Sequence, residues 1–480
     1  MKFIIVVCSL LALTAVVCLA QTVSFSPAPT ITTPEGPRAV AIRDLNGDGK
    51  LDLVVTNGPA NSLSTFLGTG SGTFTRLVTI SVPGAGRLAA ADLNADGRVD
   101  IAVVVPDGVA VLLGNGAGSF ADPTTFPDSN RPTDVVVADF NGDGKLDLAT
   151  ANFSGNATVS IFLGTGTGSF GAPTTFGTGD FSLSLTAADF NEDGHVDLAV
   201  ANIETDDVSI FLGTGTGTFT AGARIATGDG PRSIVTADFN GDGHLDLAMA
   251  STFSTAVSVL LGTGTGAFGA VTNFTTSRTT PVAIAVADFN GDGFKDIAVG
   301  CNGGGTSPAT PALSVHLGTG TGTFEAPSTF TAAGSPDYVG VGDFNADGRP
   351  DVAGVNDGSP NGAVTILLNT SGSFQFTDET LIAGVTPIKA VHISELRDAI
   401  NTLRSRNGLA AFVFSDSTLT AGVSPITMTH ITELRAALAP VFTAKGLPPP
   451  AYTDATIVAG ATVIKRIHIS ELRTAVRSVD

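Results

Sequence analysis

The sequence predicts an all-β fold of seven repeated units, followed by a smaller module of three partly helical repeats of 38 residues. A nine-residue motif, typified by DFNGDGKLD at 139–147, occurs seven times. The first aspartates of successive copies are 48, 47, 50, 49, 50 and 55 residues apart. Short β-rich runs without a helical period flank the copies. A regular period of about fifty residues is typical of a propeller or a solenoid.

The N-terminus has the pattern of a secretory signal peptide. A basic residue precedes an apolar run over residues 3–17, and a small-x-small cleavage pattern ends at Ala20. We therefore expect residues 1–20 to be removed and the protein to be secreted or held at the cell surface, without insertion into the membrane. An uncleaved membrane anchor is the alternative. Cleavage would leave Cys301 alone among three cysteines, so we expect no internal disulfide.

The charge of the chain is strongly negative and concentrated in the motif. There are 24 Lys and Arg residues against 44 Asp and Glu, a formal net charge of -20, which argues against nucleic acid or an anionic membrane as a partner. Each motif copy holds three aspartates, so 21 aspartates lie at the repeated positions of the seven copies, and the other 23 acidic residues nearly match the basic residues in number. Like charges so close together are unfavourable unless a cation neutralises them.

Comparison of the seven copies with one another indicates a calcium-binding loop. Positions one, five and nine are always Asp, position three is Asn and position six is Gly, whereas position seven shares no chemistry and would contribute its backbone carbonyl. Oxygen ligands at alternate positions around a sharp glycine turn suit Ca²⁺. We expect up to seven structural Ca²⁺ ions, held by Asp44, Asn46, Asp48, Lys50, Asp52, Asp92, Asn94, Asp96, Arg98, Asp100, Asp139, Asn141, Asp143, Lys145, Asp147, Asp189, Asn191, Asp193, His195, Asp197, Asp238, Asn240, Asp242, His244, Asp246, Asp288, Asn290, Asp292, Phe294, Asp296, Asp343, Asn345, Asp347, Arg349 and Asp351.

Other interpretations of the motif are less consistent with the sequence. Asp, Asn and Gly also form solvated turns, but seven copies in fixed phase favour a metal loop. Mg²⁺ would demand a stricter octahedron. An EF-hand needs a bidentate Glu at position twelve, where the seven copies have Val55, Val103, Thr150, Val200, Met249, Val299 and Gly354.

Each unit continues in an order that predicts four antiparallel strands, which make one propeller blade. Strands precede and follow the motif, a third strand such as residues 157–164 comes after a variable loop, and a glycine-rich turn leads to an outer strand such as residues 170–176. The turn lacks GxGxxG spacing and no helix follows, so we expect positive φ angles there and not phosphate binding. After each turn comes a phenylalanine that we expect to pack between blades, namely Phe74, Phe120, Phe170, Phe219, Phe268, Phe324 and Phe374.

Residues 22–376 resemble the FG-GAP or VCBS-type repeats of bacterial secreted proteins and of the integrin α-subunit head. Residues 170–173 reproduce the Phe-Gly-Ala-Pro letters of that repeat, and residues 324–327 come close. The resemblance implies a seven-bladed β-propeller with calcium loops between the first and second strands of its blades. In integrins only some blades carry a metal, whereas all seven motifs are complete here. The seventh is the least regular, because Pro350 removes a backbone donor.

Two segments compete to close the predicted ring. Residues 23–31 align with the outer strands of later units although they precede the first motif, so we expect them to complete the seventh blade. Residues 372–376 are the rival for that edge.

Strand alternation gives the ring two different faces. The calcium loops and glycine turns lie on one face, and the second-to-third and blade-to-blade loops lie on the other, which we call the variable face. Ligand binding usually resides in variable loops on a rigid scaffold, and integrins, which the chain resembles, use the face away from their metals. The second-to-third loops are residues 152–157, 202–207, 252–256, 301–312 and 356–362. Phe153, Phe181, Phe253 and Tyr338 are apolar binding candidates near this face, with ordinary rim packing as the alternative.

No catalytic motif is present, and we expect a binding protein that is not an enzyme. HExxH, GxSxG and clustered Cys and His sets are all missing, although a paired-carboxylate glycosidase leaves no sequence motif. We expect a monomeric, secreted adhesion or ligand-binding propeller whose partner is an extracellular protein or glycan. The alternative is a lectin, or a non-catalytic module of polysaccharide recognition. The chain has no Trp and two Tyr, so the aromatic platforms common in sugar sites are scarce.

The C-terminal residues 377–480 follow a different repeat. Asp378, Asp416 and Asp454 are 38 residues apart, as are His392, His430 and His468, each of which begins HISELR or HITELR. Leu396, Ala399, Ile400 and Leu403 fall on one predicted helical face. The His and Glu of this sequence could bind a metal, but we favour a role for Glu at the helix N-terminus, with the His as a nearby polar or capping group. Attachment or assembly at the cell surface is our hypothesis for this module.

Overall fold

The structure is a computed structural model that describes residues 23–153, 158–276, 279–302, 312–331, 334, 336–356, 362–371, 390–407, 409–416, 426–452, 466–477 and 479. The predicted signal peptide at residues 1–20 lies outside this part of the chain. Strands occur between Phe25 and Asn369, and helices between Ala390 and Arg477.

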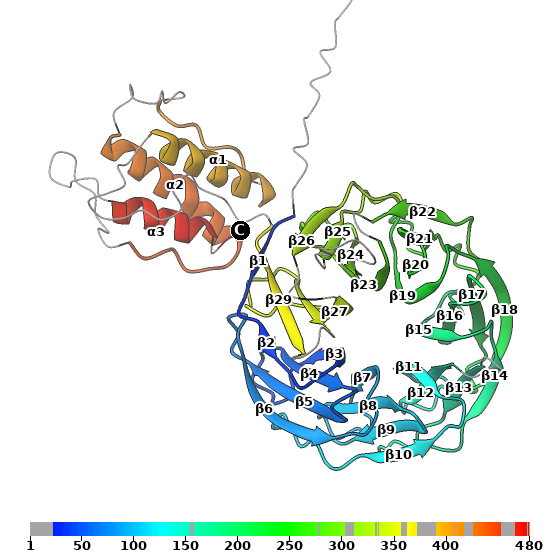
Figure 1. Cartoon of the computed structure of the whole chain (residues 1–480). Helices are drawn as coiled ribbons and strands as arrows, with labels where there is room; N and C mark the ends of the chain where they lie inside the picture. The colour runs from blue at the N-terminus through cyan, green and yellow to red at the C-terminus, as the bar shows by residue number, and fades with distance from the viewer. Residues whose placement is uncertain are drawn as a thin grey trace, which may run out of the picture.

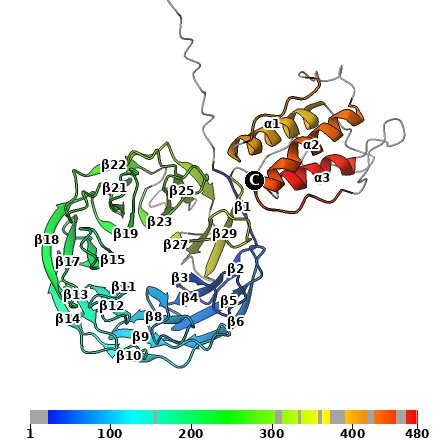
Figure 2. The same ribbon diagram turned by 180° about the vertical axis from the view of Figure 1, so that it is seen from behind.

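Seven antiparallel sheets form a closed ring, which Figure 1 shows along its axis and Figure 2 shows from behind. This confirms the predicted seven-bladed propeller with four-stranded blades. Blades one to six contain, in order, β3 (Pro37–Arg43), β4 (Asp52–Asn57), β5 (Ser62–Gly68), β6 (Phe74–Ser81); β7 (Leu88–Ala91), β8 (Asp100–Val105), β9 (Gly108–Leu112), β10 (Thr124–Pro127); β11 (Pro132–Ala138), β12 (Asp147–Asn152), β13 (Thr158–Phe162), β14 (Thr174–Gly177); β15 (Ser182–Ala188), β16 (Asp197–Asn202), β17 (Asp207–Gly213), β18 (Phe219–Ala226); β19 (Pro231–Ala237), β20 (Asp246–Ser251), β21 (Ala256–Leu260), β22 (Thr272–Thr275); β23 (Pro281–Ala287), β24 (Asp296–Cys301), β25 (Ala312–His316) and β26 (Ser328–Thr331). Blade seven contains β27 (Pro336–Gly342), β28 (Asp351–Asn356) and β29 (Ala363–Asn369), with β1 (Phe25–Pro27) and β2 (Ile31–Thr32).

Burial in each blade follows the position of the strand in the ring. The second strand begins at the ninth position of the motif and is buried along its whole length, as in β12. Outer strands such as β6 are mostly exposed. The core lies between blades, because Ile161 of the third blade and Leu198 of the fourth belong to one buried cluster. Side chains on both faces of a second strand therefore find apolar neighbours, which explains its continuous apolar sequence.

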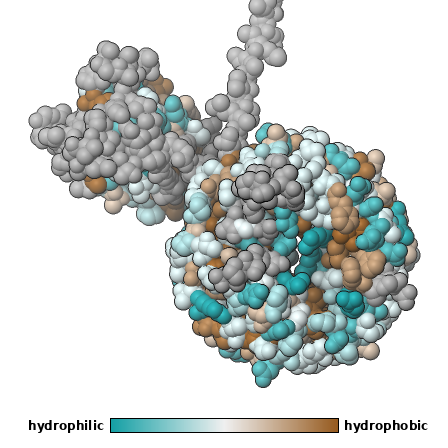
Figure 3. All heavy atoms as spheres, viewed as in Figure 1, coloured by the Kyte–Doolittle hydropathy of each residue, from teal (hydrophilic) through white to brown (hydrophobic). Residues whose placement is uncertain are grey.

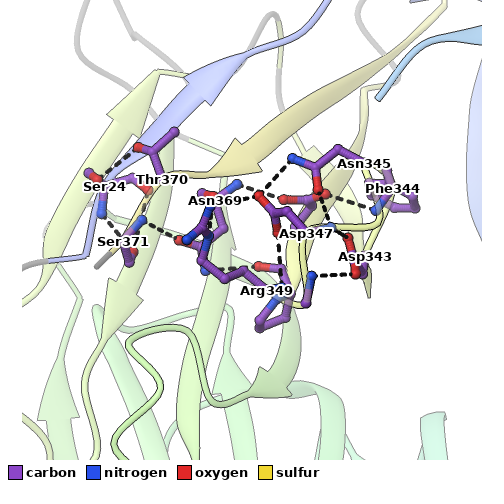
Figure 4. A network of polar contacts seen from close by, with 12 residues as sticks. Ser24, Asp343, Phe344, Asn345, Asp347, Arg349, Asn369, Thr370 and Ser371 are labelled. Atoms are coloured by element: carbon purple, nitrogen blue, oxygen red, sulfur yellow. Dashed lines mark hydrogen bonds and ion pairs between the residues drawn. The ribbon is translucent and has the colours of Figure 1, made fainter. Parts of the chain in front are cut away.

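The N-terminal segment closes the ring, as residues 23–31 were expected to do. β1 and β2 both pair antiparallel with β29, with Phe25 opposite Asn369 and Ile31 opposite Val364. Figure 4 shows the polar contacts beside this join. The Thr370 N–H donates to the Ser24 carbonyl over 2.8 Å. The rival segment, residues 372–376, lies outside the described residues.

Phenylalanines join neighbouring blades, which confirms their predicted place. The ring of Phe219 in the fourth blade packs edge-to-face on Phe140 in the third, with 5.7 Å between the centroids. Across the closure, Phe74 packs on Phe344 at 5.5 Å, and Phe25 packs on Phe289 at 5.8 Å. Phe374 itself lies outside the described residues. Such pairs add roughly 0.5–1.5 kcal/mol each beyond the burial of their area.

Three helices make up the described part of the C-terminal repeats. They are α1 (Ala390–Arg406), α2 (Met428–Ala444) and α3 (Arg466–Arg477). The predicted apolar face of α1 is fully buried in a cluster shared with the other two helices. None of the helices in the described ranges is both long and apolar enough to cross a membrane.

Histidine, and not glutamate, caps α2. The N–H of Thr427 donates to Nδ1 of His430 over 2.9 Å, and Nε2 of the same ring lies 2.7 Å from Oδ2 of Asp416. Glu433 instead accepts the Ser415 N–H outside the helix. The expected role of Glu at the helix N-terminus was therefore wrong for this repeat, whereas the expected capping role of the His is confirmed. Both ring nitrogens of His430 are engaged in hydrogen bonds.

Candidate functional site

The seven acidic loops all have the same backbone-directed geometry. In the third loop, Asp139 accepts the N–H groups of Gly142 and Gly144 over 2.7 and 2.8 Å. Oδ1 of Asn141 accepts the N–H of Asp143 over 2.9 Å. All seven position-six glycines have positive φ angles, between 78° and 92°, which explains why no other residue occurs there. The side-chain oxygens are thus oriented by the loop's own backbone.

The ninth-position aspartate is a buried clamp between two strands and the loop. Oδ2 of Asp147 accepts the N–H of Phe140 over 3.0 Å, and Oδ1 accepts the N–H of Gly164, at the end of the third strand, over 2.7 Å. Equivalent pairs of bonds recur in the other six blades. This structural role was not predicted, because the motif alone does not reveal the partner on the third strand.

The acidic loops also dock onto the next blade. The third glycine of each glycine-rich turn donates its N–H to the position-two carbonyl of the preceding blade, as from Gly217 to Phe140 over 3.0 Å. At the closure, Gly72 of the first blade donates to Phe344 of the seventh over 2.9 Å. In the seventh blade, Nδ2 of Asn369 donates to the carbonyl of Phe289 over 2.8 Å. A change in loop conformation would therefore affect the blade interface.

The seventh loop keeps the common geometry in spite of Pro350. Gly348 donates to Asp343 over 2.8 Å, and Asn369 donates to the buried Asp351 over 2.6 Å (Figure 4). Arg349, at position seven, pairs with Asp347 at 2.8 Å. The missing donor at position eight therefore leaves this loop intact.

Burial opposes ionisation of the ninth-position aspartates. Burial, as the largest effect, and the nearby carboxylates of each loop together raise the pKa of Asp296 to about 7 and that of Asp351 to about 6. Two N–H bonds to each carboxylate act in the opposite direction but do not outweigh burial. The same causes raise the pKa of the other five ninth-position aspartates. The loops therefore carry negative charge that their own hydrogen bonds do not fully stabilise.

The donor chemistry of the loops fits a hard cation. Each loop brings carboxylate and amide oxygens within nine residues, the ligand types that Ca²⁺ prefers. Lysine or arginine at position seven pairs with the position-five aspartate in four loops, as between Lys145 and Asp143 at 3.0 Å. Within the described ranges, no three His, Cys, Asp or Glu side chains are gathered as a metal cluster would require.

A cavity of about 890 Å³ lies on the opposite, variable face of the ring. It is lined by loops from second to third strands and by the starts of first strands, and Phe153 and Phe253 are part of its wall. Phe253 is 66% exposed, and the ring of Phe153 lies 4.6 Å from that of Phe181. In Figure 3, hydrophilic residues lie beside the central opening of the ring. Two of the four predicted apolar candidates therefore reach the cavity.

Tyr338 lies in the channel wall and not in the wall of this cavity. It is among the residues that line a second cavity, of about 500 Å³, between the first strands. The guanidinium carbon of Arg87 lies 6.0 Å from the centre of its ring. Burial, followed by the charge of Asp134, raises the pKa of the Tyr338 hydroxyl. These features are typical of a packing residue.

The repeated units match a known sequence family. Residues 44–299, more than half of the chain, match the FG-GAP-like repeat in five overlapping copies at 44–103, 92–150, 139–200, 189–249 and 238–299. The seventh motif lies beyond the matched span but has the same loop geometry. No curated protein sequence matches the chain at a significant level.

Several solved structures have a similar fold. BBS1N, solved in complex with ARL6DN, is 13% identical, with a TM-score of 0.51 over 71% of this chain and 96% of that one. A lectin of Agrocybe aegerita that recognises non-reducing terminal N-acetylglucosamine is 21% identical, with a TM-score of 0.45 over 63% and 81%. A proposed 6-phosphogluconolactonase of Bacteroides uniformis is 16% identical, with a TM-score of 0.49 over 62% and 86%. At these identities the similarity concerns the fold alone.

Proposed function

The chain belongs to the FG-GAP-like repeat family, and on this premise we propose that it is a secreted, calcium-binding propeller that binds an extracellular partner without catalysis. The observation that carries this proposal is the difference between the two faces of the ring. One face repeats the same acidic loop seven times, whereas the other has loops of different sequence around the cavity of about 890 Å³. Repetition suits a structural role and variety suits recognition.

Calcium would act as a structural ion in each acidic loop. The side chains at positions one, three, five and nine would hold it, together with the carbonyl of position seven. Its charge would offset the three aspartates of a loop, one of which is buried with a raised pKa. The ion would also rigidify the blade interface, because the same loop accepts an N–H bond from the next blade. In other extracellular modules such sites are weak, with Kd on the order of 0.1–1 mM.

A non-catalytic role is supported by the composition of the cavity. Among the described residues that line it, Asp337 is the one acidic side chain, and no histidine or cysteine is present. General acid–base or nucleophilic chemistry needs such groups within reach of a substrate. The cavity instead offers arginine, hydroxyl and apolar groups, which are recognition elements.

Export and partner binding are tested with the same protein. Expression of the full chain should yield a secreted product that begins at Gln21, as N-terminal sequencing would show; an intracellular, uncleaved product would contradict the secretion proposal. The purified product is then immobilised and exposed to extracellular material, with heat-unfolded product as the control. A glycan array separates protein adhesion from the lectin alternative, because selective, saturable sugar binding would favour the lectin.

A further inference from the structure

Positive charge gathers at one place in an acidic chain. The cavity on the variable face is lined by Arg38, Arg87, Arg131 and Arg232, four of the 24 basic residues of the protein, against the single lining acid Asp337. The chain as a whole carries a formal charge of -20. The cavity is therefore a local basic site on a protein that repels anions elsewhere.

The ring closes these arginines around the mouth of the central channel. Arg38 and Arg232 occupy the same position, six residues before the first aspartate of the motif, in the first and fifth blades. Arg87 of the second blade donates from Nη2 to the carbonyl of Arg232 over 3.5 Å, although the two are 145 residues apart in the chain. Burial lowers the pKa of Arg232, and Arg87 and Arg38 lower it further. The guanidinium groups of Arg38, Arg87 and Arg232 therefore lie together at the mouth of the central channel.

Two of the arginines are held in place and two are available. Nη1 of Arg87 lies 2.8 Å from Oδ2 of Asp134, and Nη2 of Arg232 lies 3.7 Å from Oδ1 of Asp337. Arg38 and Arg131 are exposed. In the part of the chain that the structure covers, neither of them has an ion-pair partner. Their charges therefore face the cavity unneutralised.

Arg131 lies at a backbone position that takes glycine in three of the six described blades. Eight residues before the first aspartate, these glycines have φ angles between 64° and 68°, and Phe181, which does not line the cavity, has a φ of 56°. Arg131 adopts the same left-handed conformation at 58°, although a side chain there costs free energy. Thr280, which also lines the cavity, does so at 61°. Strain of this kind clusters where the side chain itself is needed.

We propose that the channel mouth docks an acidic segment of a protein partner, whose carboxylates pair with Arg38 and Arg131. This inference rests on the proposed function, since it names the chemistry of the partner. Arginine forms bidentate pairs with carboxylates, and the acidic remainder of the surface would direct such a partner to this one basic site. The exposed ring of Phe253 offers apolar contact to neighbouring side chains of the segment. The lack of Trp favours a peptide over an acidic sugar chain.

The test compares an acidic with a neutral peptide on the intact secreted chain. A fluorescein-labelled peptide of alternating Glu and Gly is titrated by anisotropy at fixed free Ca²⁺, with a Gln-for-Glu peptide and an oligogalacturonate as competitors. The variants are Arg38→Gln, Arg131→Gly and their combination. The matched control is Arg76→Gln, which removes an exposed arginine from β6, the outer strand of the first blade, whose residues do not line the cavity. Circular dichroism confirms that each variant is folded.

Salt-sensitive, saturable binding of the acidic peptide is the expected result. Each single cavity variant should weaken it by roughly 10- to 100-fold, as the loss of a charged hydrogen bond does. Arg76→Gln should bind the acidic peptide as tightly as the wild type does, and the Gln peptide should not compete. Equal binding by the cavity variants, absence of saturable binding, or preference for the oligogalacturonate would overturn the inference. A partner that binds elsewhere would still leave the proposed ligand-binding function standing, and calcium-dependent melting is measured separately.

Discussion

Asp296 should make the calcium-free protein lose stability as the pH rises. Burial, as the largest effect, raises its pKa from 3.8 to about 7. A carboxyl group with a higher pKa in the folded than in the unfolded state favours folding at pH values below 3.8. That contribution is lost as the pH rises to about 7. Three pKa units correspond to about 4 kcal/mol in the free energy of unfolding.

The assay compares the wild type with Asp296→Asn, which cannot ionise. Because the chain has no Trp, denaturant unfolding is followed by circular dichroism, in EDTA and in excess Ca²⁺. The variant loses one acceptor for the N–H groups of Phe289 and Gly318 at every pH. This loss lowers its unfolding free energy by the same amount throughout, so it cancels when the changes with pH of the two proteins are compared. The difference between the two proteins in EDTA isolates the titration of this one carboxyl.

We expect the wild type in EDTA to lose about 4 kcal/mol more than the variant between about pH 4 and pH 8. Calcium should remove most of this loss, because a bound cation stabilises the ionised carboxylate. Parallel pH profiles for the two proteins in EDTA would refute the argument from burial. A pH dependence that is the same with and without Ca²⁺ would refute the binding of a cation next to Asp296.

Three further predictions concern single side chains. Asp147→Ala should cost about 2–5 kcal/mol of unfolding free energy with or without calcium, because it leaves two buried N–H donors without an acceptor. Asp143→Ala, at an exposed position, should cost clearly less in EDTA, and equal costs of the two variants in denaturant unfolding would contradict the clamp. Arg131→Gly should raise the free energy of unfolding by about 1 kcal/mol by relieving its positive φ, and a destabilised variant in the same assay would show that no strain is present. The hydrogen bond from His430, followed by Arg397, lowers the pKa of Asp416 to about 2, so the stabilising contribution of this carboxylate is present above pH 3.8 and falls as the pH drops towards 2. Asp416→Asn should remove that acid sensitivity of α2 in hydrogen exchange. Its effect at neutral pH should be modest, because the side chain is 42% exposed.

The repeat made most of the fold predictable from the sequence. The nine-residue motif fixed the number of blades, and each second strand begins at its ninth aspartate, as in β12. The likeness of residues 23–31 to later outer strands was enough to predict the closure at β29. These features depend on local patterns that recur, so one chain compared with itself contains them.

The parts that were not predicted depend on contacts between distant residues. Asp147 meets Gly164 only when the third strand folds back, and the motif does not encode that partner. Arg87 and Arg232 come together because the ring closes, and their separation of 145 residues hides the pairing. The expected role of Glu433 was wrong for a different reason. Glutamate is the usual residue at the third helical position of a capping box, but here His430 occupies that position.

The number of calcium ions per chain tests the central claim most directly. Equilibrium dialysis of the secreted protein against Ca²⁺ at millimolar concentration, followed by elemental analysis, gives this number, and Asp139→Asn provides a variant with one loop impaired. We predict saturation that approaches seven ions for the wild type, with about one fewer for the variant. Saturable binding of close to zero Ca²⁺ ions per chain, with the ring still folded, would contradict the account. It would mean that the hydrogen bonds of the acidic loops are enough to stabilise them without a cation.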